Sequence, residues 1–190
     1  RMVKFDDAAP AEPARTEPFS LITEADRLKL PAGVEDAYPL SLLQAGMLFH
    51  SELNPESAIF HDLHSFHLQV RFDRNKLEQA IAQLAMSHAT LRTSCDLRTY
   101  SEPLQLVHEH VTIPLEEEDL RHLDAAEQES AVAAALEVEK QRKFDWEHAP
   151  LLRFRVLCRT DDTCQFVLSF HHLILDGWSV AALLTELFQI

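Results

Sequence analysis

Two strand-like runs near the end of the chain, 151–159 and 164–171, constrain the fold more than any other feature. They are separated only by the polar segment Thr160-Asp161-Asp162-Thr163. Short apolar runs joined by such a segment are typical of an antiparallel β-hairpin. The sequence therefore predicts two adjacent, paired strands in this region.

Other strand-like patterns are scattered through the chain. Residues 65–72 alternate between apolar and polar side chains, which predicts a half-buried strand. Shorter strands are predicted at 91–97 and 104–111. The acidic run 116–119 is expected to be a solvated loop, because adjacent like charges favour exposure to water.

Helices are predicted where a capping residue precedes an apolar stripe. Ser41, Asp73 and Asp124 are such residues, and Ser179 is expected to cap the last helix. Helices and strands therefore mix irregularly along the chain. This order indicates an α+β (mixed α/β) fold, in which a β-sheet packs with helices, and not a regular βαβ array.

Composition argues against several classes of function. Only three glycines are present, and neither a dinucleotide-binding GxGxxG motif nor a Walker loop can be written. A net charge of -14 argues against binding to nucleic acid or to anionic membranes. No apolar run approaches the ~20 residues that span a bilayer. The three cysteines form no CxxC pair, so a cytoplasmic, reducing location is expected.

The chain is expected to contain three parts. Residues 1–18 combine proline, alanine and charged residues, which predicts a flexible linker. Residues 19–37 would lead into the domain, and residues 38–190 would form it. The final apolar stripe runs to Ile190 without a polar tail, which indicates that a parent protein continues beyond it.

The candidate site lies in residues 170–179, which read FHHLILDGWS. Strand alternation places His172 on the face of Phe166, Leu168 and Phe170, and His171 on the opposite face. A histidine on a buried or cleft-facing side needs a hydrogen bond or a chemical task. A neutral imidazole in dry surroundings can accept a proton near pH 7.

Two further residues of this segment are candidates for the site. Asp176 is placed to orient a histidine ring or to fix the loop, and Gly177 is expected to permit a turn that other residues resist. The alternative is a hydrogen-bonded core histidine followed by a solvated aspartate, because the pattern is short.

This segment closely resembles the HHxxxDG signature of condensation domains in nonribosomal peptide synthetases. His171, His172, Asp176 and Gly177 match its fixed positions, and a Trp-Ser pair follows. Residues 38–50, YPLSLLQAGMLFH, resemble the first motif of the same family.

A third segment, 87–93, reads SHATLRT and resembles the second motif, which usually reads RHExLRTxF. Three residues depart from that pattern: Ser87 replaces Arg, Ala89 replaces Glu, and Cys95 replaces Phe. The resemblance covers the chain from about Tyr38 to its end.

The resemblance implies a reaction and roles for residues. Condensation domains join a carrier-bound donor thioester to a carrier-bound acceptor amine as an amide. His172 would be the catalytic histidine, acting as a base or by positioning the amine. Asp176 would be a structural aspartate paired with an arginine, for which Arg92 is the candidate. His171 would be structural, and the Gly177 amide would contact the thioester carbonyl.

The resemblance also implies a fold and partners. The fold is that of chloramphenicol acetyltransferase, with two lobes, of which this chain would be the N-terminal one. Without the C-terminal lobe, the isolated chain is expected to be inactive. Substrates would arrive on phosphopantetheine arms of upstream and downstream peptidyl carrier domains, so no bound cofactor is expected. An adenylation domain would belong to the same synthetase, and the 1–18 linker would follow a carrier domain.

Three alternatives stay open. An epimerization domain shares the histidine motif but usually continues DGxSW, whereas Trp178 here precedes Ser179. Another acyltransferase of the superfamily, or a non-catalytic lobe that only docks carrier domains, would also fit. A metal site at His61, His64 and His67 is disfavoured, because a strand points His64 away from the other two.

Overall fold

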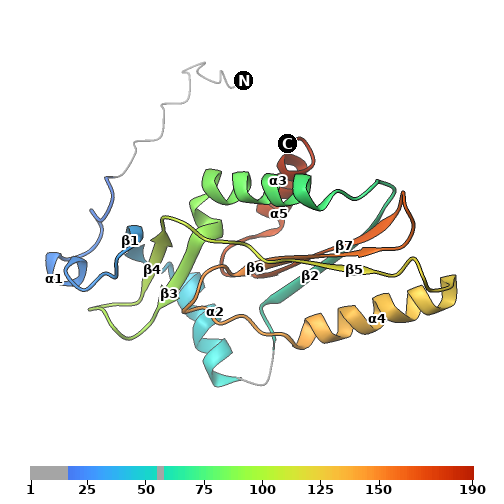
Figure 1. Cartoon of the computed structure of the whole chain (residues 1–190). Helices are drawn as coiled ribbons and strands as arrows, with labels where there is room; N and C mark the ends of the chain where they lie inside the picture. Colours follow the sequence, from blue (N-terminus) through green and yellow to red (C-terminus); the bar gives the residue numbers. More distant parts are fainter. Residues whose placement is uncertain (1–16, 55–57) are drawn as a thin grey trace, which may run out of the picture.

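The computed structural model describes residues 17–54 and 58–190, which form two β-sheets and five α-helices (Figure 1). The larger sheet has the strand order β2-β7-β6-β5, and the smaller one β1-β4-β3. The strands are β1 Val34–Pro39, β2 His61–Leu68, β3 Thr93–Asp96, β4 Leu104–His108, β5 Leu115–Asp119, β6 Leu152–Cys158 and β7 Cys164–His171. The helices are α1 Glu24–Arg27, α2 Leu42–Leu53, α3 Arg74–Ser87, α4 Ala125–Gln141 and α5 Gly177–Leu187. The predicted α+β class is confirmed.

The predicted hairpin forms the centre of the larger sheet. Strands β6 and β7 are antiparallel, with Phe154 opposite Leu168 and Cys158 opposite Cys164 beside the turn. Every residue of β7 is buried. Both faces of this strand are therefore covered, which explains why its apolar residues do not all fall on one side.

Helices cover the two faces of the larger sheet (Figure 1). Helices α3 and α5 lie on one face, where Leu84 and Leu183 share a core with Phe154, Phe166 and Phe170. Helix α4 lies on the other face, and a second core gathers there: Leu120, Val132, Ala135, Leu157 and Val167. Each fully buried Phe contributes about 1.5–3 kcal/mol of hydrophobic stabilisation.

Helix starts follow the local capping signals. Ser41 and Asp124 each form a capping box with the residue three positions on, and Asp73 caps α3. The prediction for the last helix is wrong by three residues. Asp176, and not Ser179, is the N-cap of α5.

The acidic run that was expected to be a loop is instead part of strand β5, which pairs in parallel with β6. Arginine side chains from other elements pair with its carboxylates. Glu118 pairs with Arg155 at 2.6 Å and Glu117 with Arg74 at 3.3 Å. Ion pairs with Arg155 on the neighbouring strand β6 and with Arg74 at the start of α3 offset the repulsion that the sequence pattern suggested.

Strand β2 begins four residues before the predicted start at Ser65. Its register with β7 runs from His61 opposite His171 to Leu68 opposite Cys164. The end of β2 therefore lies opposite the beginning of β7, and the apolar alternation beyond Leu68 is not part of the strand. The strand predicted at 91–97 is shorter in the structure: β3 covers Thr93–Asp96, and the two residues before it belong to a 3₁₀ helix, Ala89–Arg92.

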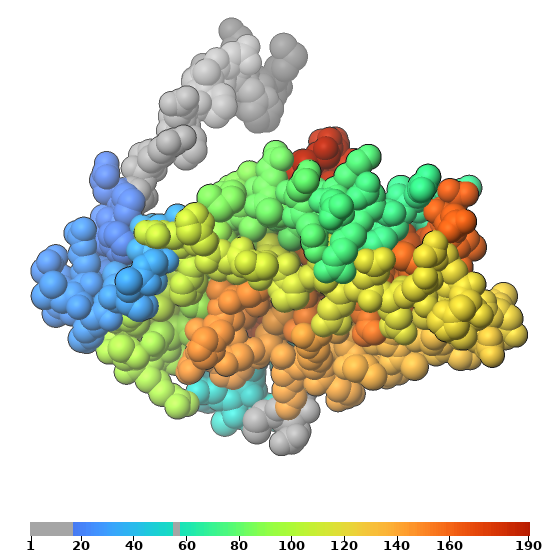
Figure 2. All heavy atoms as spheres, in the orientation of Figure 1, coloured from blue at the N-terminus to red at the C-terminus, as the bar shows by residue number. Residues whose placement is uncertain are grey.

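The N-terminal lead-in is folded from residue 19 onward, ahead of the predicted domain start at Tyr38. Phe19, Ile22 and Leu30 pack against the small core of the three-stranded sheet, which contains Ala37 and Leu104. Figure 2 shows this part of the chain, in blue, against one end of the molecule. Residues 1–16 of the expected linker lie outside the described residues.

Candidate functional site

The two adjacent histidines lie where β7 ends and the chain turns toward α5. Their faces follow the predicted alternation. His171 has the parity of Val167, which packs on the α4 side, whereas His172 contacts Asp62, the cross-strand neighbour of Phe170. The two imidazoles therefore lie on opposite sides of the sheet.

The two rings differ in their exposure to solvent. His171 is only 5% exposed, whereas the side chain of His172 is 40% exposed. The reason is that β7 ends at His171, so His172 belongs to the turn that follows and lies beyond the packed part of the strand. A buried, dry position for His172 is therefore wrong for this chain, whereas the cleft-facing alternative is compatible with a part-exposed ring.

His172 is held by two contacts with the chain around the start of β2, one from Phe60 in the preceding turn and one from Asp62 in the strand. Its Nδ1 lies 2.6 Å from Oδ2 of Asp62, and its backbone N–H donates to the Phe60 carbonyl at 2.8 Å. A neutral ring that donates from Nδ1 to a carboxylate keeps its lone pair on Nε2. No described residue forms a hydrogen bond with that nitrogen, so it is available to accept a proton or a hydrogen bond.

His171 is held in the neutral form by its surroundings. Burial, with smaller contributions from the neighbouring His61 and His172, lowers its pKa to about 4. Its Nδ1 accepts the backbone N–H of Leu173 at 3.1 Å. Since an unprotonated Nδ1 accepts this bond, the proton of the neutral ring lies on Nε2. His171 therefore acts as a fixed part of the scaffold near neutral pH.

Asp176 does not make the expected pair with Arg92. It is exposed, and its Oδ1 accepts the Ser179 backbone N–H at 2.8 Å at the start of α5. Hydrogen bonds from the Ser179 amide and hydroxyl lower the pKa of this carboxyl. Its role in the described structure is that of a helix cap.

Arg92 is committed to another part of the fold. It is buried, its Nε donates to the Ala85 carbonyl at 2.8 Å, and a terminal nitrogen lies 2.7 Å from Glu35. It also donates to the carbonyls of His108 and Glu109. Arg92 thus connects the 3₁₀ helix to α3, β1 and the end of β4. All three of its guanidinium nitrogens already have partners there.

Gly177 is exposed and is the first residue of α5. Among the described glycines, only Gly33 has a positive φ, and a Cβ at position 177 would meet no atom within 4 Å. The expectation that the turn needs the conformational freedom of glycine here is therefore wrong.

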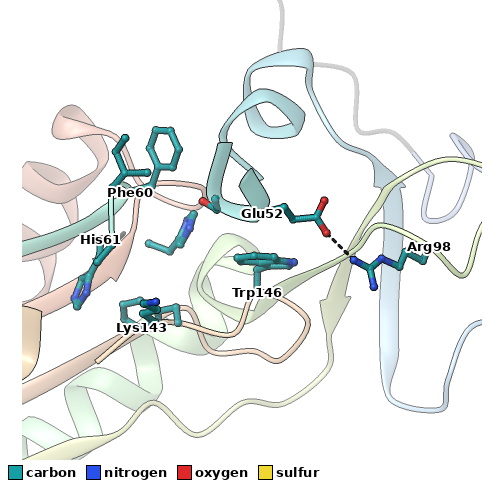
Figure 3. A pocket seen from close by; sticks show the side chains of 11 residues that line it. Glu52, Phe60, His61, Arg98, Lys143 and Trp146 are labelled. Carbon is teal, nitrogen blue, oxygen red and sulfur yellow. Dashed lines mark hydrogen bonds and ion pairs between the residues drawn. The ribbon is translucent and has the colours of Figure 1, made fainter. Parts of the chain in front are cut away.

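A cavity of about 540 Å³ lies beside His171. Figure 3 shows Phe60, His61, Lys143 and Trp146 around it, with Glu52 and Arg98 joined at 2.8 Å on one side. The ring of His61 meets the edge of Phe144, and burial lowers the pKa of this imidazole. The lining is mainly aromatic and aliphatic, which suits a neutral organic group.

The described ranges, 17–54 and 58–190, hold neither a metal centre nor a membrane span. No group of three or more His, Cys, Asp or Glu side chains there is arranged to hold a metal ion. None of the helices in this part of the chain is long and apolar enough to cross a membrane.

Asp62 is the site residue that the sequence did not reveal. It belongs to β2, 110 positions before His172, and only the pairing of β2 with β7 brings the two together. A usable signal was present, because Asp62 is an acidic residue beside an apolar–polar alternation that predicts a strand.

Comparison with known proteins gives one consistent family. The family model described as "Condensation domain" matches residues 34–190. The AMB antimetabolite synthetase AmbE of Pseudomonas aeruginosa is 36% identical over 194 residues, covering 96% of this chain and 9% of that protein. A linear gramicidin synthase polypeptide of Brevibacillus parabrevis is 43% identical over 154 residues, covering 81% of this chain and 3% of that protein.

Solved structures show the same fold. The starter condensation domain of rhizomide synthetase RzmA has a TM-score of 0.71 at 18% identity, covering 80% of this chain and 37% of that one. The four-domain nonribosomal peptide synthetase AB3403 has a TM-score of 0.72 at 22% identity, covering 84% of this chain and 12% of that one. The chain thus spans well under half of each of these relatives.

Proposed function

This chain belongs to the condensation domain family of nonribosomal peptide synthetases, and we propose that it supplies the histidine part of an active site that forms amide bonds. The donor is a carrier-bound thioester and the acceptor a carrier-bound amine. The match to the family model over residues 34–190 and the AmbE and gramicidin synthase relatives support this proposal.

The observation that carries the proposal is the position of His172. Its ring is part-exposed at the end of β7, Nδ1 is occupied by Asp62, and Nε2 has no partner among the described residues. An imidazole in this state suits general base catalysis near neutral pH. The neighbouring His171 does not, because its ring is buried and hydrogen-bonded inside the fold.

The proposed step uses Nε2 of His172. The lone pair of the acceptor amine attacks the thioester carbonyl carbon, and as the C–N bond forms, the amine proton moves to Nε2. The C–S bond then breaks, and the departing thiolate takes the proton back from the imidazolium. If His172 acts only by position, the amine donates a hydrogen bond to the same nitrogen. The backbone N–H of Gly177, at the start of α5, is our candidate contact for the carbonyl oxygen.

The proposal includes partners and surroundings. Both substrates would arrive on phosphopantetheine arms of upstream and downstream carrier domains, with an adenylation domain in the same synthetase. Residues 38–190 would belong to the N-terminal lobe, completed by a C-terminal lobe, and residues 1–18 would link it to a carrier domain. We place this assembly in the cytoplasm, consistent with three buried, unpaired cysteines in the described part of the chain.

The test is amide formation by the complete synthetase module with both carriers loaded. His172→Ala is expected to slow product formation by about 10²- to 10⁴-fold. His148→Ala is the matched control, because His148 is also exposed and paired with a carboxylate, Asp145, at 2.7 Å. Its rate should equal that of the wild type.

Two results would contradict the proposal. One is a folded His172→Ala module with a near-normal rate for a poorly nucleophilic amine, where a missing base matters most. The other is inversion of the donor stereocentre without an amide product, which would indicate an epimerization domain instead.

A further inference from the structure

We propose that Asp62 is the positioning residue for His172, setting both the direction and the tautomer of its ring. The proposal rests on the proposed function of His172 and extends it to a residue on a different strand. Asp62 does not touch substrate in this scheme. It acts through the imidazole, by keeping the Nδ1 proton in place and the Nε2 lone pair available.

The chain around the start of β2 contacts both the backbone and the ring of His172. The Phe60 carbonyl accepts the His172 backbone N–H at 2.8 Å, and two residues further on Asp62 accepts from the ring at 2.6 Å. One short stretch of chain therefore fixes both the backbone and the ring of the histidine, which leaves the imidazole little freedom to turn.

The strand itself is firmly placed. Asp62 lies opposite Phe170 in the register of β2 with β7, and Phe170 is buried in the main core. The backbone from which the carboxylate projects is thus anchored by a ladder of eight paired residues, from His61 to Leu68. A group presented by such a strand can hold a ring more accurately than one on a loop.

Asp176 is the other carboxylate that could take this role, but its Oδ1 already accepts a hydrogen bond within α5. It accepts the Ser179 amide at 2.8 Å as the cap of α5. The Asp62 carboxylate, by contrast, has no hydrogen-bond partner other than His172 among the described residues. It is also 43% exposed, so no buried network in the fold depends on it. The only side-chain hydrogen bond described for Asp62 is therefore the one that this proposal requires, although its charge also acts on His61 and His171.

The chemical effect follows from the charge of Asp62. When His172 takes the amine proton at Nε2, the ring becomes a cation with N–H groups on both nitrogens. A carboxylate on Nδ1 stabilises that cation and does not itself need to take a proton. Replacing it with an amide removes the charge and allows the ring to present either nitrogen.

The experiment compares Asp62→Asn with the wild type in the complete synthetase module. We expect kcat to fall by about 10- to 100-fold, because a small misplacement of a catalytic group has an effect of this size. KM for both loaded carriers should change by less than about two-fold. Asp62→Glu, which restores the charge on a longer side chain, should recover part of the loss. Asp145→Asn removes the equivalent carboxylate from the His148 pair and should leave kcat unchanged.

A double-mutant cycle separates this inference from the proposed function. If Asp62 acts only through His172, Asp62→Asn should have no further effect in a His172→Ala background. If His172→Ala alone has no effect, the proposed function fails. If His172→Ala is slow but Asp62→Asn keeps the wild-type kcat, only the role of Asp62 is overturned. A full additional loss from Asp62→Asn in the His172→Ala background also overturns it.

A spectroscopic readout checks the tautomer directly. In a ¹⁵N-histidine-labelled condensation domain near pH 8, His172 should show a protonated Nδ1 and an unprotonated Nε2. Asp62→Asn should produce a mixture of the two tautomers, while the tautomer of His171 stays the same. A wild-type ring that is protonated on Nε2 would overturn the proposal.

Discussion

Asp176 accepts a hydrogen bond from the backbone N–H of Ser179 at 2.8 Å, and this contact makes it the cap of α5. The pair with Arg92 that the sequence motif suggested does not form in this chain. Because α5 leads directly away from the two histidines, the cap also defines where their turn ends. The effects expected from substituting Asp176 are therefore those of a lost helix cap and not those of a stranded buried charge.

Asp176→Ala is expected to lower the Tm by about 2–4 °C, the effect of a lost N-cap in a chain of this size. Asp176→Ser keeps an oxygen that can accept the Ser179 amide, so its Tm should be close to that of the wild type. The pKa of Asp176 is lowered in the folded state, so its stabilisation is present above the ordinary aspartate value and is lost as the pH falls through the folded value. Thermal melts at pH 7 and pH 3 measure both effects. A Tm drop that is as large at pH 3 as at pH 7 would contradict the charged-cap explanation.

Arg92→Ala is expected to cost at least about 2 kcal/mol of unfolding free energy. The guanidinium is 5% exposed and donates to the Ala85 and His108 carbonyls, which would lose their charged donor. Arg98→Ala is the matched control, because Arg98 is largely exposed and its only ion pair within the described residues is with Glu52. Its effect should stay within about 0.5 kcal/mol. Urea unfolding midpoints distinguish the two, and equal midpoints would refute the structural role of Arg92.

The sequence predicted the fold best where the signal is local. Ser41 and Asp124 cap helices through bonds to residues three positions away, so a short window contains the whole interaction. The β6–β7 hairpin is local in the same sense. The placement of His171 and His172 on opposite sides was also correct, although His172 lies one residue beyond the end of β7.

The remaining features depend on contacts between distant parts of the chain. Asp62 reaches His172 only through the register of β2 with β7, which a single sequence does not specify. Strand β5 was missed because its carboxylates meet arginines from other elements, among them Arg74 and Arg155. The Asp176–Arg92 pair was transferred from a family pattern, and in this chain the packing of β1 and β4 gives the arginine other partners.

Glu139 of α4 and Arg153 of β6 form a buried ion pair, and removing one partner should lower the free energy of unfolding. Both side chains are nearly inaccessible, and Arg153 also lies over the ring of Phe144 at 4.0 Å. Glu139→Ala leaves the guanidinium without its carboxylate, so we expect a loss of about 3–5 kcal/mol. Glu137→Ala, on the exposed side of the same helix, should change stability by no more than about 0.5 kcal/mol. Chemical denaturation measures both, and a small effect of Glu139→Ala would show that water reaches Arg153.

His171 should make the stability of the chain depend on pH below neutrality. Its folded pKa is lowered to about 4 by burial, whereas the unfolded imidazole titrates near 6.5. Between these values the unfolded state binds the extra proton, so stability is complete above about pH 6.5 and falls as the pH decreases toward 4. The slope from this one group is at most about 1.4 kcal/mol per pH unit.

His171→Asn tests this dependence, because its side-chain oxygen can still accept the Leu173 N–H while the residue no longer titrates. The variant should be less stable than the wild type at pH 7.5, where the lost ring leaves space in the core. Its stability should nevertheless fall less steeply from pH 6.5 to 4.5. His61 and His108 also have lowered pKa values, so some slope will remain. Urea unfolding at five pH values gives both curves, and parallel curves would show that His171 is already charged or exposed in the folded chain.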